Sequence, residues 1–274
     1  MRRLPWRWLL WLAGLALALG AALLCWSATS GRLPWAKEDL WAALQRRGAL
    51  RVCLDASYPP FENVDEQGRF EGLDVDLARL LAARWGLEAQ FVNIHFDGLY
   101  DALLAERCDL VLSALPYDRT MTRDVLYSQS YFNAGQVLLA LAEDEAIVRI
   151  DDLVGRRVAV ELGGEGHHWL REWNRYRPEG IEIVALRETD DLAEALRRGE
   201  AEAAVCDHVT ALRLRQAAPL RLVGPPLTDA PLVAATRRDG AQLVAQVDLA
   251  LAAWRADGTL ERLQARWLQP QPSE

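Results

Sequence analysis

The chain has 274 residues, of which 51% are hydrophobic and 26% are charged, so it is neither disordered nor fibrous and can form one large domain or two lobes. Its formal net charge is −8, and its first thirty residues hold three arginines and no acidic side chain, so the remainder is more acidic still. Binding to a phosphate backbone needs clustered Lys and Arg, so this composition argues against nucleic acid as a partner.

Residues 1–30 have the pattern of a targeting segment, with three arginines before an uncharged apolar stretch over residues 8–26. The stretch lies in length between a secretory signal and a spanning helix, so it predicts either a cleaved signal peptide or a retained membrane anchor. Small residues before Gly31 suit cleavage, and lipidation at Cys25 is a third possibility. Because arginines near the start stay inside, all three place the body outside the cytoplasm, in the periplasm or on the outer face of the cytoplasmic membrane.

Three cysteines follow this segment, at Cys53, Cys108 and Cys206. The odd number leaves at least one of them unpaired or paired between chains. Cys53 and Cys206 lie in apolar runs typical of strands, where a free thiol packs as a small hydrophobic group. We therefore expect these thiols to be buried and unpaired, and without a Cys-x-x-Cys motif a zinc or redox site is not predicted.

The first part of the body alternates short β-rich runs with stretches of helical periodicity. Residues 75–85 show the helical pattern clearly, because their apolar side chains fall on one face and Gly86 follows the last turn. In chain order the pattern predicts a helix at 37–47, a strand at 50–54, a helix at 75–85, a strand at 90–92, a helix at 97–106 and a strand at 109–113. This order indicates a parallel sheet covered on both faces by helices.

The same order recurs in the second part. After the run at 134–140, the pattern predicts strands at 157–160, 181–184 and 203–206, and helices at 165–176, 191–199 and 208–216. A proline-rich linker over residues 225–231 then leads to two closing helices at 241–256 and 260–267. The repetition predicts an α/β protein of two lobes, each a parallel-rich sheet flanked by helices.

Two lobes leave a cleft, and ligands of open parallel sheets bind beyond the carboxyl ends of the strands. Polar loops follow the predicted strands at 55–61, 93–96, 113–123, 161–166 and 207–208. Tyr58, Phe61 and Phe96 are suited to enclose a planar or apolar part of a ligand, and Asp207 is suited to receive a cation. The glycine-rich run at 163–166 precedes a helix start, where free backbone N–H groups favour an anion.

Together these residues resemble family 3 of the bacterial extracellular solute-binding proteins, the polar-amino-acid receptors of transport systems. The resemblance covers about residues 48–268 and rests on four stretches, at 50–61 with 72–78, 108–113 with 127–128, 155–160 with Gly163, and 199–207 with 257–267. It implies a type 2 periplasmic-binding fold that closes on a ligand in the cleft between the lobes by hinge motion. Lobe 1 would hold residues 48–136 plus 232–268, and lobe 2 residues 137–228.

Matching positions imply a set of ligand-binding residues. Tyr58 and Phe96 would pack against the ligand side chain, with Asp55 nearby for polar contacts. Ser113 would offer its carbonyl group, and Asp207 its carboxylate, to an α-ammonium group. The full set is Asp55, Tyr58, Phe96, Ser113, Arg119, Gly164, Glu165 and Asp207.

The expected carboxylate site departs from the family pattern. Gly164 and Glu165 would present backbone N–H groups to an α-carboxylate. The family usually adds an arginine that forks onto this carboxylate, but Met121 stands at that position. Arg119 is our choice of substitute from a shifted loop, and Arg123 is the alternative.

The resemblance implies a binding protein that captures a small polar solute, with an amino acid as first choice, and delivers it to the permease of an ABC transporter. We expect a monomer without catalysis, cofactor or metal. One alternative is a membrane-anchored ligand-sensing module, if residues 8–26 stay in the membrane. Another is an enzyme similar to cyclohexadienyl dehydratase on the same fold, because Glu165 lies near that enzyme's glycine-rich loop. However, His167 stands where its catalytic glutamate would.

Overall fold

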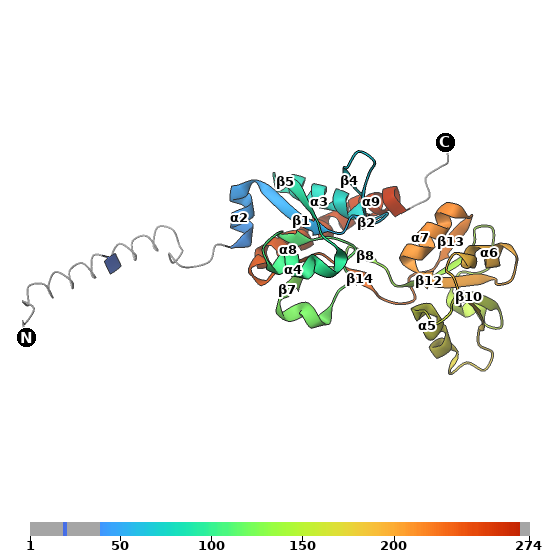
Figure 1. Cartoon of the computed structure of the whole chain (residues 1–274). Coiled ribbons are helices and arrows are strands. Elements are labelled where there is room, and N and C mark those ends of the chain that lie inside the picture. The colour runs from blue at the N-terminus through green and yellow to red at the C-terminus, as the bar shows by residue number, and fades with distance from the viewer. Residues whose placement is uncertain (1–18, 21–38, 269–274) are drawn as a thin grey trace, which may run out of the picture.

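The structure is a computed structural model that describes residues 19–20 and 39–268 (Figure 1). The expected targeting segment at residues 1–30 therefore lies outside the described residues, apart from positions 19–20. No helix within the described ranges is both long enough and apolar enough to span a membrane. Two separate five-stranded sheets divide the described chain into two lobes that lie side by side.

Lobe 1 is built on the sheet with strand order β5-β1-β6-β15-β7. The first three strands run parallel, whereas β15 runs antiparallel to both of its neighbours. The strands are β1 (Ala49–Leu54), β5 (Glu88–Asn93), β6 (Leu110–Val111), β7 (Val125–Tyr127) and β15 (Ala235–Arg237). The helices are α2 (Leu40–Arg47), α3 (Leu73–Arg84), α4 (Leu99–Leu104), α8 (Ala241–Ala256) and α9 (Thr259–Leu268).

Both faces of the lobe 1 sheet are buried, as its near-continuous apolar strands require. Val52 of β1 packs with α2, α3, α8 and α9 in one core cluster. The next residue of the strand, Cys53, packs with α4 in a second cluster on the opposite face. Because side chains alternate across a strand, the sequence of β1 supplies both cores at once.

Lobe 2 repeats the plan with the strand order β11-β10-β12-β9-β13. Helix α5 packs on one face of this sheet, and α6 and α7 pack on the other. The strands are β9 (Gln136–Leu141), β10 (Arg157–Glu161), β11 (Glu182–Leu186), β12 (Ala203–Asp207) and β13 (Leu220–Val223). The helices are α5 (Glu165–Asn174), α6 (Asp191–Arg197) and α7 (His208–Ala217).

Smaller elements complete the fold. A three-stranded meander follows β1, and a two-stranded ladder joins the segments that pass between the lobes. The remaining strands are β2 (Ser57–Tyr58), β3 (Glu62–Val64), β4 (Phe70–Glu71), β8 (Phe132–Asn133) and β14 (Pro231–Leu232). The 3-10 turns are η1 (Phe96–Gly98), η2 (Arg119–Arg123), η3 (Ile150–Leu153) and η4 (Arg238–Gly240).

The chain crosses between the lobes twice, after β8 and before β14, and these two strands pair antiparallel. The amide oxygen of Asn133 accepts hydrogen bonds from the backbone N–H groups of Gly135 and Ala230, both at 2.9 Å. One side chain therefore joins both crossings. Gly135 is required here, because a Cβ atom at this position would lie 2.1 Å from the carbonyl oxygen of Thr228.

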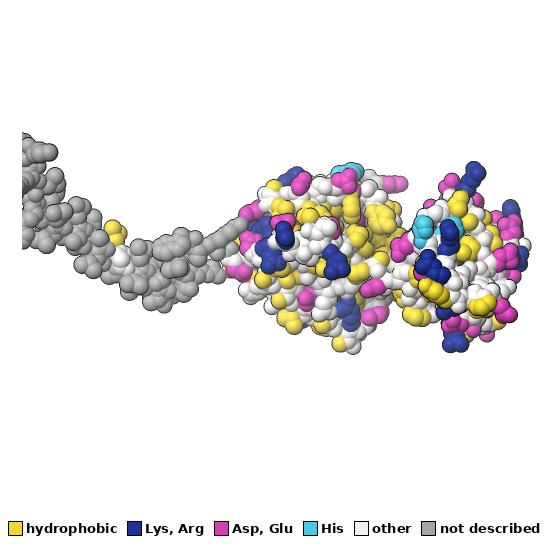
Figure 2. Space-filling view, turned by 90° about the horizontal axis from the view of Figure 1, so that it is seen from below, with side chains coloured by type: hydrophobic (Ala, Val, Ile, Leu, Met, Phe, Trp, Pro, Cys, Tyr) yellow, Lys and Arg dark blue, Asp and Glu magenta, His cyan; other side chains and the backbone are white. Residues whose placement is uncertain are grey.

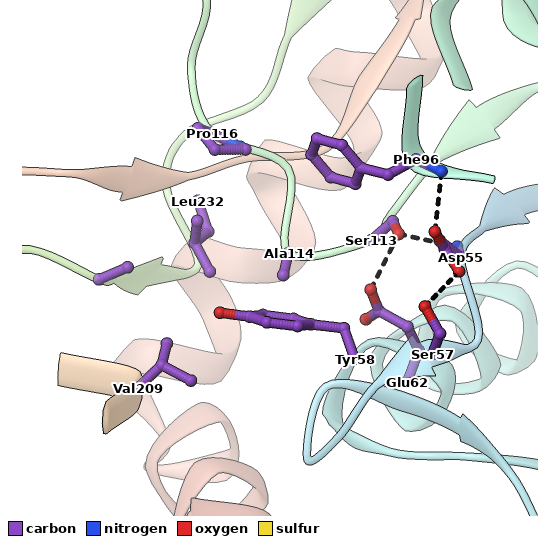
Figure 3. A pocket seen from close by; sticks show the side chains of 11 residues that line it. Asp55, Ser57, Tyr58, Glu62, Phe96, Ser113, Ala114, Pro116, Val209 and Leu232 are labelled. Atoms are coloured by element: carbon purple, nitrogen blue, oxygen red, sulfur yellow. Dashed lines mark hydrogen bonds between the residues drawn. The ribbon is translucent and has the colours of Figure 1, made fainter. Parts of the chain in front are cut away.

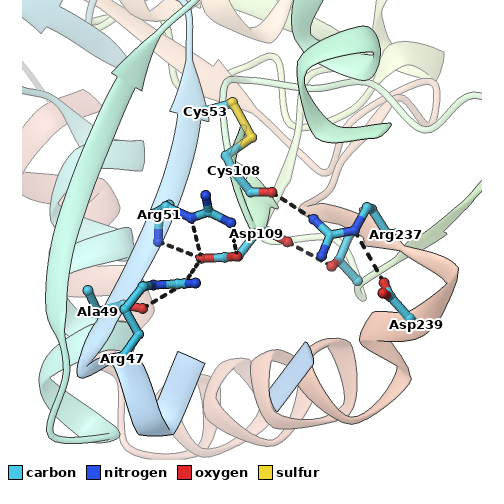
Figure 4. A network of polar contacts seen from close by, with 9 residues as sticks. Arg47, Ala49, Arg51, Cys53, Cys108, Asp109, Arg237 and Asp239 are labelled. Atoms are coloured by element: carbon cyan, nitrogen blue, oxygen red, sulfur yellow. Dashed lines mark hydrogen bonds and ion pairs between the residues drawn. A yellow bond between two sulfur atoms is a disulfide. The ribbon is translucent and has the colours of Figure 1, made fainter. Parts of the chain in front are cut away.

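A disulfide joins Cys53 to Cys108 and corrects the expectation that Cys53 is unpaired (Figure 4). The two cysteines lie on or beside neighbouring strands, β1 and β6, and their Cα atoms are 5.7 Å apart, which is within the range that a disulfide requires. The expectation for Cys206 is confirmed, because this thiol is free and buried. Burial raises the pKa of the Cys206 thiol, which keeps it protonated and unreactive.

An ion-pair network lies beside the disulfide, at the end of the lobe 1 sheet (Figure 4). The carboxylate of Asp109 is fully buried and pairs with both Arg47 and Arg51, the latter at 2.9 Å. Arg237 donates to the carbonyl oxygen of Cys108 at 2.9 Å. The network attaches α2 and β15 to the strands that carry the disulfide.

The disulfide closes a loop of 55 residues, so its loss should destabilise lobe 1. A crosslink of this span restricts the unfolded chain, and we expect Cys53→Ala/Cys108→Ala to lower the free energy of unfolding by about 2–4 kcal/mol. Urea denaturation measures this loss. Without reductant, alkylation of the unfolded protein should label Cys206 but neither Cys53 nor Cys108, and labelling of all three would contradict the assignment.

Candidate functional site

A cavity of about 400 Å³ opens at the junction of the two lobes (Figure 3). Figure 2 shows the narrow waist between the lobes, with hydrophobic side chains gathered beside it on lobe 1. Most of the lining comes from lobe 1, and Val209 of α7 contributes from lobe 2. The lining residues are Asp55, Ser57, Tyr58, Glu62, Phe96, Ser113, Ala114, Pro116, Ala134, Val209 and Leu232.

Asp55 organises the aromatic part of the cavity. Its carboxylate accepts a hydrogen bond from the Ser57 hydroxyl group at 2.7 Å and another from the Phe96 backbone N–H at 2.8 Å. These bonds tie the turn after β1 to the turn after β5. Tyr58 and Phe96 remain 46% and 43% exposed, so part of each ring is available to a ligand. The structure thus brings together these three residues that the sequence singled out.

Ser113 closes the floor of the cavity at the end of β6. Its hydroxyl oxygen accepts a hydrogen bond from the Asp55 backbone N–H at 2.9 Å, and the hydroxyl group donates to the carboxyl group of Glu62 at 2.8 Å. Sequence reasoning missed Glu62, which is 1% exposed and lines the cavity. It directly follows the buried Phe61, but no local pattern distinguishes such an acid from an exposed one.

Asp207 lies at the end of β12 and faces lobe 1 without lining the cavity in this structure. Its carboxylate caps α7 by accepting a hydrogen bond from the Thr210 backbone N–H at 2.9 Å. Burial raises the pKa of Tyr58, and the negative charge of Asp207 raises it further. Asp207 is therefore close enough to Tyr58 to act on it electrostatically across the cleft.

Gly164 and Glu165 stand at the start of α5, outside the cavity lining. The Gly164 N–H group donates to the carbonyl oxygen of Glu161 at 3.2 Å, and the Gly163 N–H group donates to Nδ1 of His167 at 3.0 Å. These two amides are therefore engaged within lobe 2. The first turn of α5, beginning at Glu165, keeps backbone N–H groups without helical partners, as every helix start does.

The predicted carboxylate clamp is not assembled in this structure. Arg119 is exposed at the start of η2 and does not line the cavity. Met121, at the family's usual arginine position, is partly buried and packs with Tyr100 and Tyr127 against the core beside α4. None of the residues that line the cavity is Lys, Arg or His, and its acidic residues are Asp55 and Glu62.

Helix α5 carries acidic and histidine side chains beside a surface depression of lobe 2. Glu165, His168 and Glu172 border a surface depression on this helix together with Arg171 and Arg175. Within the described residues, however, His, Cys, Asp and Glu side chains nowhere gather in a group of three that could hold a metal ion. The structure gives no basis for naming a metal or cofactor ligand.

Comparisons with known proteins identify the family. The model for bacterial extracellular solute-binding proteins, family 3, matches residues 50–270. The L-cystine-binding protein TcyJ of Escherichia coli strain K12 is 28% identical over 236 residues, which cover 85% of this chain and 87% of that protein. Most of both chains is therefore aligned.

Solved structures show the same fold. An ancestral cationic amino acid solute-binding protein matches with a TM-score of 0.63 and 30% identity, covering 85% of this chain and all of that one. An ancestral cyclohexadienyl dehydratase matches with a TM-score of 0.74 and 25% identity, covering 85% of this chain and 97% of that one. The predicted type 2 periplasmic-binding fold is confirmed.

Two substitutions of Asp207 can distinguish its structural role as the cap of α7 from a role in ligand binding. Removing the cap in Asp207→Ala should lower the free energy of unfolding by about 1 kcal/mol, whereas Asp207→Asn should cost much less because Asn is an equally good N-cap. Urea denaturation of the two variants checks this. Equal losses in both would show that the Thr210 bond does not stabilise α7.

Proposed function

We propose that this chain, which belongs to the bacterial extracellular solute-binding proteins of family 3, captures an amino acid between its lobes and delivers it to an ABC importer. The observation that carries the proposal is the cavity at the lobe junction, which is lined by the aromatic residues Tyr58 and Phe96, by Asp55 and by Ser113. The relatives are periplasmic or transporter-associated binding proteins, and the chain acts outside the cytoplasm as they do. A buried disulfide suits an oxidising compartment.

Residues of both lobes would hold the ligand. Tyr58 and Phe96 would enclose its side chain beside Asp55, and the carbonyl group of Ser113 would accept a hydrogen bond from its α-ammonium group. Asp207 would pair with the same ammonium group, because only one of its carboxylate oxygens is engaged in the capping bond. Asp207 lies outside the cavity lining here, so lobe closure would bring it onto the ligand.

Closure would be a rotation of two rigid lobes about the crossings that Asn133 joins. We assign residues 48–136 plus 232–268 to lobe 1 and residues 137–228 to lobe 2, with the pivots at the two crossings. The protein would work as a monomer, and residues 8–26 could additionally anchor it in the membrane if the segment is retained.

Charge selects among amino acids. The cavity lining holds the carboxylate of Asp55 and no basic side chain, so an acidic side chain on the ligand would be repelled or left unpaired. We therefore propose neutral and cationic amino acids as the ligand class, with aspartate and glutamate excluded. The relatives named for histidine and for lysine, arginine and ornithine fit this class.

A receptor explains the site better than an enzyme does. The fold is shared with an ancestral cyclohexadienyl dehydratase. The family resemblance, however, implies that His167 stands where that enzyme's catalytic glutamate would. His167 accepts a hydrogen bond from the Gly163 N–H, so it holds its own loop. We propose no catalytic residue.

The first test is thermal denaturation against the twenty amino acids, followed by calorimetry on those that raise the melting temperature. A ligand present at about 100 times its Kd adds about 2.7 kcal/mol to the stability of the folded protein. At least one neutral or cationic amino acid should give this stabilisation, and aspartate and glutamate should not. Stabilisation by the acidic amino acids alone would refute the charge argument.

Asp207→Asn then tests the ammonium contact without removing the cap of α7. A hydrogen bond to a charged group contributes about 1.5–3 kcal/mol, so the Kd should rise about 10- to 100-fold. The exposed Asp191 on α6 provides the control, and Asp191→Asn should bind like the native protein. An unchanged Kd in Asp207→Asn would remove Asp207 from the site.

Arg119→Ala tests the proposed substitute for the missing arginine. If Arg119 reaches the ligand carboxylate in the closed form, its removal should weaken binding of the amino acid but not of the matching amine that lacks the carboxylate. Arg123→Ala is the control and should leave both affinities unchanged. Weaker binding of the amino acid in Arg123→Ala but not in Arg119→Ala would assign the contact to Arg123. Unchanged affinity in both variants would leave the backbone N–H groups of α5 as the carboxylate partner.

A further inference from the structure

Two buried acids lie beneath the floor of the cavity. Glu62 in β3 is 1% exposed, and Asp74 in the first turn of α3 is fully buried. One oxygen of the Glu62 carboxyl group accepts the hydrogen bond from Ser113 at 2.8 Å. One oxygen of the Asp74 carboxyl group accepts bonds from the Tyr131 hydroxyl group, at 2.8 Å, and from the Ala114 backbone N–H. Each acid is thus bonded through one oxygen.

The second oxygen of each acid, Oε2 of Glu62 and Oδ1 of Asp74, is buried without a donor. The carboxyl groups of Asp74 and Asp55 raise the pKa of Glu62. Glu62 in turn raises the pKa values of the Tyr58 and Tyr131 phenols. No Lys, Arg or His is among the groups that act on either acid. Among the described residues, no basic side chain therefore neutralises the charge of Glu62 or Asp74.

One proton bound between the two carboxyl groups would both neutralise one of them and give the two oxygens a hydrogen-bond donor. Two adjacent carboxylates in a buried site cannot both remain ionised, because desolvation and mutual repulsion favour the neutral form of one of them. Burial, followed by the charge of Asp74, raises the pKa of Glu62 far above its usual range. A hydrogen atom between Oε2 of Glu62 and Oδ1 of Asp74 would also satisfy the two oxygens that lack donors.

We propose that Glu62 and Asp74 share a single proton at neutral pH and that this proton-sharing pair positions the floor of the cavity. The pair fixes Ser113 through Glu62 and fixes Ala114 through Asp74, and both of these residues line the cavity. Ser113 in turn receives the Asp55 N–H, so the bonds extend to the residue that orders the aromatic rings. Glu62 and Asp74 are positioning residues, since they act on the site through Ser113 and Ala114.

The shared proton gives the stability of the protein a pH dependence of known sign. The unfolded carboxyl groups release their protons near pH 4, whereas the folded pair keeps one. Burial also raises the pKa of Asp74, to about 6, so above that pH and below the higher pKa of the pair folding takes up one proton. In that range the pair lowers the folding equilibrium constant tenfold for each unit of pH increase. Stability from this source is greatest at acidic pH and declines as the pH rises.

Glu62→Gln isolates this contribution. The glutamine amide can accept the Ser113 hydrogen bond through its oxygen and donate to Asp74 through its nitrogen, so the contacts of the pair are kept without a titrating proton. Glu66→Gln is the matched control, because Glu66 is an exposed acid on the same β3–β4 connection. Both variants remove one acidic group from the same hairpin.

Urea unfolding of the full-length protein at pH 6, 7 and 8 tests the proposal. The ratio of the folding equilibrium constant of Glu62→Gln to that of the native protein should increase about tenfold for each unit of pH increase. The same ratio for Glu66→Gln should not change with pH. Parallel pH dependences for Glu62→Gln and the native protein would overturn the proposal.

Infrared spectroscopy of the native protein provides a second test that does not depend on a variant folding. The folded protein at pH 7 should show the carbonyl stretching band of a protonated carboxyl group, and unfolding at the same pH should abolish it. A spectrum with only ionised carboxylates in the folded protein would also overturn the proposal.

Discussion

The side-chain amide of Asn133 joins the two segments that connect the lobes, and the geometry of the site depends on this junction. Its oxygen receives the N–H groups of Gly135 and Ala230, one from each crossing, and its backbone carbonyl group lies 2.8 Å from Nδ1 of His208 at the start of α7. The His208 ring also stacks on Phe132, with ring centroids 4.7 Å apart. The start of α7, next to Asp207, is thereby held beside the two crossings, so a rotation of lobe 2 about them would move Asp207 relative to the cavity.

The two lobes contribute to the site in different ways. Lobe 1 is assembled before closure, because Asp55 and Ser113 join the loops that carry the aromatic rings. Lobe 2 would contribute the charge of Asp207, whose carboxylate is held by its capping bond. Ligand binding would therefore require little reorganisation within either lobe, and most of the change would be in the angle between them. A proton on the Glu62–Asp74 pair would also keep the floor of the cavity from carrying a further negative charge.

The sequence predicts the parts of the fold that depend on local patterns. Helix α3 and the parallel strands have clear periodicity, and Asp55 and Phe96 were found because they follow predicted strands. The antiparallel strands β7 and β15 were missed, since each has three residues and they pair across more than a hundred positions. The Cys53–Cys108 disulfide and the burial of Glu62 depend on which strands are neighbours, which a single sequence does not show. Leu232 was also missed, because it lines the cavity only as a result of the pairing between β14 and β8 at the crossings.

Closure of the lobes on an amino acid is the central claim, and small-angle X-ray scattering tests it directly. The measurement compares the radius of gyration of the ligand-free protein with that of the protein saturated with the amino acid that stabilises it most. The account predicts a smaller radius in the saturated protein, because the lobes approach each other about the Asn133 junction. An unchanged radius at saturation would show that the ligand binds without closure and would contradict the account.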